Sequence, residues 1–230
     1  MNALIGIGLY TPAEAGRLLE LPAATVSRWL RGHTANGRRY APLWKSQVDL
    51  EDGHTYLGFR DLMEARVAAA FISHGVSPQR VRAAITLARE VYGKDHPLST
   101  NRFRTDGKDI FLRVIESAED GDERERLLNT FQKQYAFAEV IEPSFKHVEF
   151  DDQGSPLIWW PRGRKGQILV DPARAFGQPI DAVSSVPTSV LAAAGRAEGV
   201  ARAARAFDVP PPSIRRAMEF EDALEARSAA

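Results

Sequence analysis

The sequence contains no cysteine among its 230 residues. This absence excludes disulfide bonds, thiolate catalysis and cysteine-ligated metal sites, and it fits a reducing compartment. The apolar runs are only a few residues long, far short of a membrane span. Residues 1–9 have neither a basic stretch nor a full apolar stretch, so we expect no signal peptide, no membrane partner and a cytoplasmic location.

Groups that would carry catalysis are also missing. The histidines show no i, i+3 or i+4 pair of the kind that binds a metal: they are His33, His54, His74, His96 and His147. Gly6-Ile7-Gly8 lacks the third glycine of a dinucleotide-binding loop. The adjacent carboxylates near Asp106 and Asp151 fall at predicted turns, where aspartate is common. We therefore expect that the protein is not an enzyme and that it has neither a cofactor nor a metal site.

Charge is balanced overall, with 30 basic and 30 acidic side chains, but it is distributed unevenly. No acidic residue lies between Glu20 and Asp49. That window holds five basic residues: Arg28, Arg31, Arg38, Arg39 and Lys45. A local surface of one sign is typical of a contact with a phosphate backbone.

The same window contains the pattern of a helix-turn-helix. Thr11, Pro12 and Glu14 form a capping signature for a first helix, which the Leu21-Pro22 pair ends. A second helix is predicted over 23–31, with an apolar stripe spaced i, i+3, i+4: Val26, Trp29 and Leu30. Two short helices joined by a tight turn, the second basic on its free face, predict a helix-turn-helix.

We expect the free face of the second helix to contact DNA through Thr25, Ser27, Arg28 and Arg31. The alternative is an ordinary solvated helix face. Arg38, Arg39 and Lys45 are expected to contact flanking phosphates from a wing, and their alternative role is solubility. Wing strands are predicted near 39–44 and 55–59, after the Asn36-Gly37 turn.

Two further helices are predicted, one over 60–74 and one that Ser77-Pro78 caps. Gly93 and Pro97 stop the second of these soon after Tyr92. The resulting order is helix, turn, helix, wing, helix, helix. This order resembles the DNA-binding domain of MerR-type regulators. The residues that carry the resemblance are Tyr10-Thr11-Pro12-Ala13-Glu14-Ala15, Thr25-Val26-Ser27-Arg28-Trp29, Phe59-Arg60-Asp61-Leu62 and His74-Gly75-Val76-Ser77.

The sequence pattern of the second half predicts a mixture of strands and helices. Alternation over 102–112 around Asp106-Gly107 predicts a hairpin, and 147–160 predicts another around Asp152-Gln153-Gly154. A strand is expected at 168–170. Helices are expected over 123–137, 188–194, 200–207 and 213–224. Trp159 and Trp160 should face opposite ways on their strand, so that one of them is buried.

The closing helices form a second helix-turn-helix pattern around Phe207-Asp208-Val209, although Pro210-Pro211-Pro212 stiffens the entry to the last helix. From Gln134 onward the chain resembles the C-terminal domain of VapB-type antitoxins, through Phe176-Gly177-Gln178-Pro179 and Val186-Pro187-Thr188. Candidate contacts to DNA or a partner in this half are Arg162, Arg164, Lys165, Ser213, Arg215 and Arg216. The alternatives are a solvated turn for the first three and a small helical bundle for protein contact for the others.

The sequence thus predicts a mainly helical α+β protein with a winged helix-turn-helix over 1–96 and a partner-binding part over 97–230, with a β-hairpin-rich middle and helical C-terminus. The resemblance implies an antitoxin of a type II toxin–antitoxin system. Such a protein binds operator DNA as a homodimer, represses its own operon and neutralises a PIN-like ribonuclease toxin. The alternatives are a MerR-like regulator that senses a small molecule and a nucleic-acid enzyme subunit without chemistry of its own.

Overall fold

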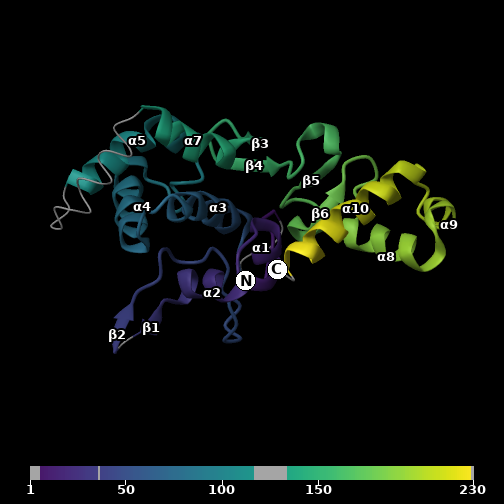
Figure 1. The fold of residues 1–230 in the computed structure, drawn as a ribbon, viewed down its shortest axis with the longest axis horizontal. Coiled ribbons are helices and arrows are strands. Elements are labelled where there is room, and N and C mark those ends of the chain that lie inside the picture. Colours follow the sequence, from purple (N-terminus) through teal and green to yellow (C-terminus); the bar gives the residue numbers. More distant parts are fainter. Residues whose placement is uncertain (1–5, 36, 117–133, 229–230) are drawn as a thin grey trace.

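The computed structural model describes residues 6–35, 37–116 and 134–228 (Figure 1). The N-terminal elements are α1 (Pro12–Leu19), α2 (Ala23–Arg31), β1 (His33–Ala35), β2 (Arg38–Tyr40), α3 (Phe59–Ser73) and α4 (Pro78–Tyr92). The predicted order of helix, turn, helix, wing, helix and helix is confirmed. None of the described helices is both long and apolar enough to cross a membrane.

The remaining elements alternate between helical and β segments. They are α5 (Asn101–Glu116), α7 (Gln134–Phe145), β3 (Val148–Phe150), β4 (Pro156–Trp159), β5 (Ile168–Val170), β6 (Pro179–Asp181), α8 (Thr188–Glu198), α9 (Val200–Ala206) and α10 (Pro211–Ser228), with short 3-10 turns at Arg164–Gly166 and Ala175–Gly177. The four strands pair antiparallel in the order β3-β4-β5-β6. The fold is therefore mainly helical α+β, as predicted.

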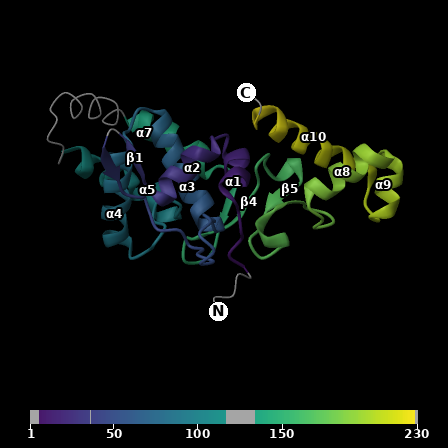
Figure 2. The same ribbon diagram turned by 90° about the horizontal axis from the view of Figure 1, so that it is seen from below.

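The helices gather at two ends of the molecule (Figures 1 and 2). Helices α3, α4, α5 and α7 lie together at one end, and α8, α9 and α10 at the other, with α1 between them. Two contacts tie α1 and its approach to the C-terminal end. The Arg17 guanidinium lies 3.1 Å from the Glu221 carboxylate, and the Tyr10 hydroxyl donates to the Gly177 carbonyl at 2.7 Å.

Helix α4 ends where the sequence predicts. Gly93 takes a left-handed conformation (φ 65°) and its N–H donates to the Arg89 carbonyl, which closes the last turn. The chain then turns back, and α5 packs along α4. A long coiled-coil extension of α4 is thereby excluded.

The predicted hairpin over 102–112 is wrong, because these residues belong to α5. Phe103, Ile110, Phe111, Val114 and Ile115 are buried on one face of that helix. Their spacing follows the helical period, and burial against α3, α4 and α7 outweighs the turn preference of Asp106-Gly107. Of the helix predicted over 123–137, residues 123–133 lie outside the described part of the chain, and 134–137 open α7.

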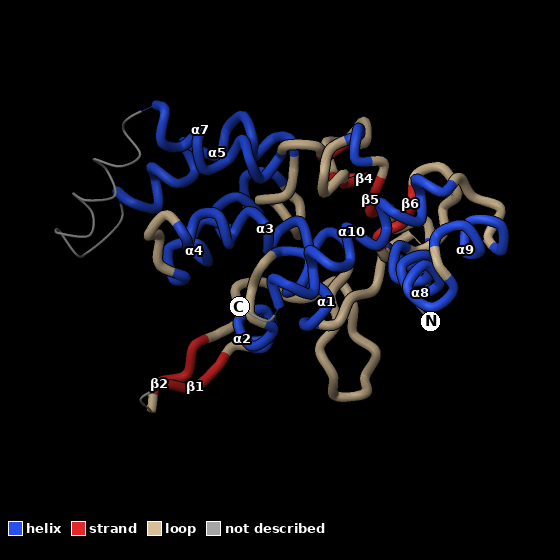
Figure 3. The backbone as a smooth tube through the Cα atoms, turned by 45° about the vertical axis from the view of Figure 1, so that its right-hand side comes forward, coloured by secondary structure: helices blue, strands red, loops and turns tan. Residues whose placement is uncertain are grey.

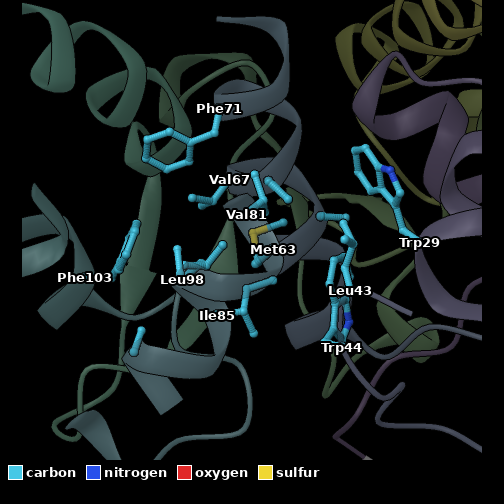
Figure 4. Packing of buried hydrophobic residues seen from close by; sticks show 14 of the residues in the cluster. Trp29, Leu43, Trp44, Met63, Val67, Phe71, Val81, Ile85, Leu98 and Phe103 are labelled. Carbon is cyan, nitrogen blue, oxygen red and sulfur yellow. The ribbon is translucent and has the colours of Figure 1, made fainter. Parts of the chain in front are cut away.

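One hydrophobic core crosses position 96, where the sequence suggested a division. Phe71 of α3 stacks on Phe111 of α5 with ring centroids 4.0 Å apart, and Leu98 and Phe103 belong to the same cluster (Figure 4). Glu64 of α3 accepts the N–H groups of Leu98 and Ser99. The first 96 residues and the segment that follows therefore pack into one hydrophobic core. A second, smaller core lies among α8, α9 and α10.

Candidate nucleic-acid interface

Helices α1 and α2 are set against each other by a tight turn. The Thr11 side chain and Glu14 form the predicted capping box at the start of α1. Glu20 ends α1 in a left-handed conformation (φ 61°). A Cβ atom on Gly16 would lie 2.5 Å from the Leu21 carbonyl oxygen, so only glycine lets the chain pass this close to α1.

Helix α2 separates an apolar face from a basic one, as predicted. Val26, Trp29 and Leu30 are buried, whereas Arg28 and Arg31 are exposed. Thr25 and Ser27 are half-buried beside them. This leaves two guanidinium groups and two short hydroxyl side chains on the free side of the second helix. That is the composition used for base-edge and phosphate contacts.

Both arginines already have a contact within the protein. Arg28 donates to the Thr25 hydroxyl at 3.0 Å, a neighbour one turn earlier. Arg31 donates to the Gly53 carbonyl. Gly53 follows the exposed acidic loop that contains Asp49, Glu51 and Asp52. The window that lacks acidic residues in sequence therefore has carboxylates close by in space, a proximity that sequence spacing did not indicate.

The wing, defined here as residues 33–40, projects from the helical body (Figure 3). Its strands pair His33 with Tyr40 and Thr34 with Arg39, and the His33 and Tyr40 rings stack at 4.9 Å. The Arg38 guanidinium lies over the Tyr40 ring at 5.6 Å. Arg38 and Arg39 are both exposed on this hairpin.

The predicted wing strands at 39–44 and 55–59 are therefore wrong in position. The hairpin forms earlier, on both sides of Gly37. Trp44 is buried instead of lying on a strand, and Leu57 forms only an isolated bridge with Tyr10. Phe59 begins α3 because the Gly58 N–H donates to Asp61 at 2.8 Å, which caps that helix.

Three hydrogen bonds hold residues 41–43, which follow the wing directly, one of them to α2 and two to α4. The Leu43 N–H donates to the Trp29 carbonyl at 2.7 Å. Arg82 of α4 donates through Nε to the Pro42 carbonyl at 2.9 Å, and also to the Ala41 carbonyl. Between α2 and the wing, a Cβ on Gly32 would lie 2.3 Å from the Tyr40 carbonyl oxygen, at a φ of 70°. Pattern analysis missed Arg82 because its partners are backbone oxygens about 40 residues away in sequence.

The segment after the wing is held by Asp61, which is fully buried. Its carboxylate accepts from the Trp44 indole (2.9 Å), the Ser46 hydroxyl (3.2 Å) and the Gln47 N–H (2.9 Å). It also lies 2.7 Å from His96 Nε2. Burial alone would lower the pKa of His96, but the hydrogen bond and charge of Asp61, with help from Glu64, outweigh it and raise that pKa. Burial raises the pKa of Glu64 to about 7.

Lys45 lies in this segment and not on the wing. It is exposed, and it lines a polar cavity together with Arg60 and Arg89. The structure therefore places six of the seven predicted DNA-contacting residues on α2 and the wing, and it sets Lys45 apart from them.

Most of the second predicted set is engaged internally. Arg162 donates to the Glu219 carbonyl at 3.0 Å, and Arg164 pairs with Glu149 at 2.8 Å. Ser213 is buried and accepts from Arg216, which also pairs with the buried carboxylate of Asp181 at 2.9 Å. The exposed members that make no such contact among the described residues are Lys165 and Arg215. Trp159 is the buried tryptophan of its pair, packed beneath Arg66 at 4.8 Å.

Comparison with known proteins agrees with this geometry. Residues 8–85 match the family model described as "Putative DNA-binding HTH domain". The chain is 28% identical over 224 residues, covering 93% of both sequences, to "Putative antitoxin VapB45" of Mycobacterium tuberculosis. The crystal structure of Rv2018 from the same organism superposes with a TM-score of 0.72 at 27% identity, covering 93% of this chain and 99% of that one.

The family match over residues 8–85 agrees with the helix-turn-helix arrangement of the N-terminal part. The other two comparisons confirm, over nearly the whole chain, the resemblance to VapB-type antitoxins that the sequence motifs indicated. The protein is thus a homologue of a protein described as a putative antitoxin.

Proposed function

We propose that this protein is a cytoplasmic antitoxin that represses its own operon through α2 and the wing and neutralises a PIN-like ribonuclease toxin. The observation that supports operator binding best is the exposure of Arg28 and Arg31 on α2 beside a wing anchored to both α2 and α4. A rigid pair of basic elements can enter a groove and contact its flanking phosphates without first being ordered.

We assign operator contact to Thr25, Ser27, Arg28 and Arg31 on α2, with Arg38 and Arg39 on the flanking phosphates. Lys45 would add a more distant phosphate contact. The internal bonds of Arg28 to Thr25 and of Arg31 to Gly53 must then be exchanged for DNA contacts. Because each is a single bond to a neutral oxygen at the surface, its loss costs little beside a charged contact with phosphate.

Toxin binding is assigned to residues 97–230, where four of the exposed large apolar side chains of the described chain lie: Leu157, Phe176, Val183 and Val190. Lys165 and Arg215 add exposed positive charge to this part. Exposed apolar groups of this size favour a protein partner over solvent. A homodimer fits a two-fold symmetric operator. Light scattering should then give about twice the 25.4 kDa of one chain, and a clean monomer mass would contradict the homodimer.

The operator proposal is tested by changing Arg28 and Arg31 together to Ala in the full-length protein. Fluorescence anisotropy with the DNA upstream of the protein's own gene should show a loss of about 1–3 kcal/mol of binding free energy for each contact removed. The matched control is Arg113→Ala, an exposed arginine on α5. Unchanged operator affinity in a folded double variant would refute the assignment to α2.

A further inference from the structure

A polar cavity of about 540 Å³ opens beside the Asp61 network. Its walls come from three places: the segment after the wing with the start of α3, the α4–α5 connection, and the β3–β4 turn. Four cationic side chains line it, and the lining carboxylate is that of Asp95. The cations are Lys45, Arg60, Arg89 and Lys94. The cavity therefore carries an excess of three positive charges.

This charge is not neutralised within the protein. Arg89 donates to the Asp95 backbone carbonyl at 3.2 Å, and Lys94 reaches the Gln153 side-chain oxygen at 3.4 Å, both uncharged acceptors. Within the ranges that the structure describes, Lys45 and Arg60 have neither a hydrogen bond nor an ion pair. Elsewhere arginines are paired, as Arg164 is with Glu149. Clustered cations repel one another, so an anion placed among them is stabilised.

One hydroxyl group in the lining also lacks a hydrogen-bond partner among the described residues. Ser155 is only 4% exposed, and its hydroxyl makes no hydrogen bond to any described residue. Its backbone is fixed by Asp151, whose carboxylate accepts the Ser155 N–H at 2.8 Å. The Gln47 Oε1 atom also lacks a partner among the described residues, but it is buried against Gly58 and does not open to the cavity. A polar molecule bound in the cavity would supply the Ser155 hydroxyl with a partner.

We propose that this cavity binds a small phosphate-bearing metabolite. The phosphate lies among Arg60, Arg89 and Lys94, because guanidinium and ammonium groups are the usual protein partners of phosphate. A hydroxyl group on the remainder of the ligand bonds to the Ser155 hydroxyl. The volume falls in the range of small-molecule sites, and the polar walls select against an apolar ligand. The site does not depend on the toxin or the operator.

Isothermal titration of the full-length protein with inorganic phosphate, pyrophosphate and ribose 5-phosphate tests the proposal. We expect saturable binding of at least one of them, weakened about tenfold or more by either Arg60→Gln or Arg89→Gln. Both arginines are exposed, and a thermal melt identifies any variant that does not fold. The control is Arg113→Gln, outside the cavity, which should bind as the parent protein does.

Ser155→Ala sharpens the test, since removing this hydroxyl should weaken ribose 5-phosphate more than pyrophosphate. Absence of saturable binding to all three probes would overturn the proposal. So would an equal loss in Arg113→Gln, which would indicate non-specific attraction to net charge.

A second arm separates a free phosphate compound from the phosphates of DNA. Pyrophosphate should remain bound when a short operator duplex is added, and the Arg28→Ala/Arg31→Ala variant should bind pyrophosphate normally. Displacement by the duplex, together with loss of duplex affinity in Arg60→Gln and Arg89→Gln, would show that the cavity serves DNA and would overturn the metabolite site.

Discussion

The Asp61 carboxylate and the His96 imidazole lie 2.7 Å apart, both buried, and they join the segment behind the wing to the connection between α4 and α5. Asp61 gathers donors from Trp44, Ser46, Gln47 and Gly58 as well. A single carboxylate thus positions three stretches of backbone that are distant in sequence.

Removing the Asp61 carboxylate should strongly destabilise the folded protein. Asp61→Ala leaves several buried donors without an acceptor, and we expect a loss of about 3–5 kcal/mol in the free energy of unfolding. Asp61→Asn should cost less, since its amide oxygen retains part of the network. Urea denaturation measures both, with the exposed Asp152→Asn as control. A loss below about 1 kcal/mol in Asp61→Ala would contradict the role of the network.

Stability should fall as pH rises through neutrality. The pKa of Glu64 goes from its usual 4.5 to about 7 in the folded protein, and that of His96 is raised above its usual 6.5. The folded protein therefore holds protons that the unfolded chain releases, and raising the pH removes this advantage. The slope should reach about 1.4 kcal/mol per pH unit for each proton involved.

Thermal melts between about pH 5 and pH 8 check this dependence, since the Glu64 contribution is lost between its unfolded pKa of 4.5 and its folded pKa of about 7. Glu64→Gln should flatten the dependence while keeping an acceptor for one of the two N–H groups, because Leu98 bonds to one carboxylate oxygen and Ser99 to the other. A melting temperature that rises with pH over this range would show that other groups dominate.

Arg82 should matter for DNA binding more than for stability. It donates to the Ala41 and Pro42 carbonyls from α4, so Arg82→Ala releases the base of the wing without opening the core. Operator affinity should fall by about 1 kcal/mol or more, while the melting temperature changes little. Arg80→Ala, two residues earlier on the same helix, serves as the comparison, since it removes a bond to the Val114 carbonyl of α5 and none to residues 41–43. Equal operator affinity in Arg82→Ala and the parent would show that the wing needs no anchor.

Phe176 and Val183 are 60% and 58% exposed, and both lie in the part assigned to the toxin. The variant Phe176→Asp/Val183→Asp should lose co-purification of the toxin yet still bind the operator, because desolvation of a carboxylate at an interface is costly. Val91→Asp, an exposed valine on α4, is the control. Toxin retained by the double variant but lost in Val91→Asp would reverse the assignment of surfaces.

Sequence patterns predicted those elements whose signals are local. The Thr11–Glu14 capping box, the Val26–Trp29–Leu30 stripe and the stop at Gly93 depend on neighbours within one or two turns, and all are present in the structure. The hairpin around Asp152 and Gly154 likewise follows from its own turn.

Elements and contacts that depend on residues far apart in the sequence could not be predicted from local patterns. Helix α5 owes its state to the packing of Phe103 and Phe111 on Phe71, which overrides the Asp106-Gly107 dipeptide. Ser213 and Arg216 are placed on a helix by the sequence pattern, but Asp181, 35 residues before Arg216, pairs with Arg216, which in turn donates to Ser213. Three separate segments line the cavity that contains Arg60 and Arg89, so the spacing of residues along the chain could not predict it.

The core that joins Phe71 to Phe103 and Phe111 has a consequence for the lifetime of the protein in a cell. A protease that cuts α5 or α7 would remove the apolar side chains that bury one face of α3. Helix α3 carries Asp61, whose hydrogen bonds hold the segment after the wing. Repression, one of the two proposed activities, would then be lost through a cut far from the helix assigned to the operator, whereas the second core among α8, α9 and α10 shares no residue with this one.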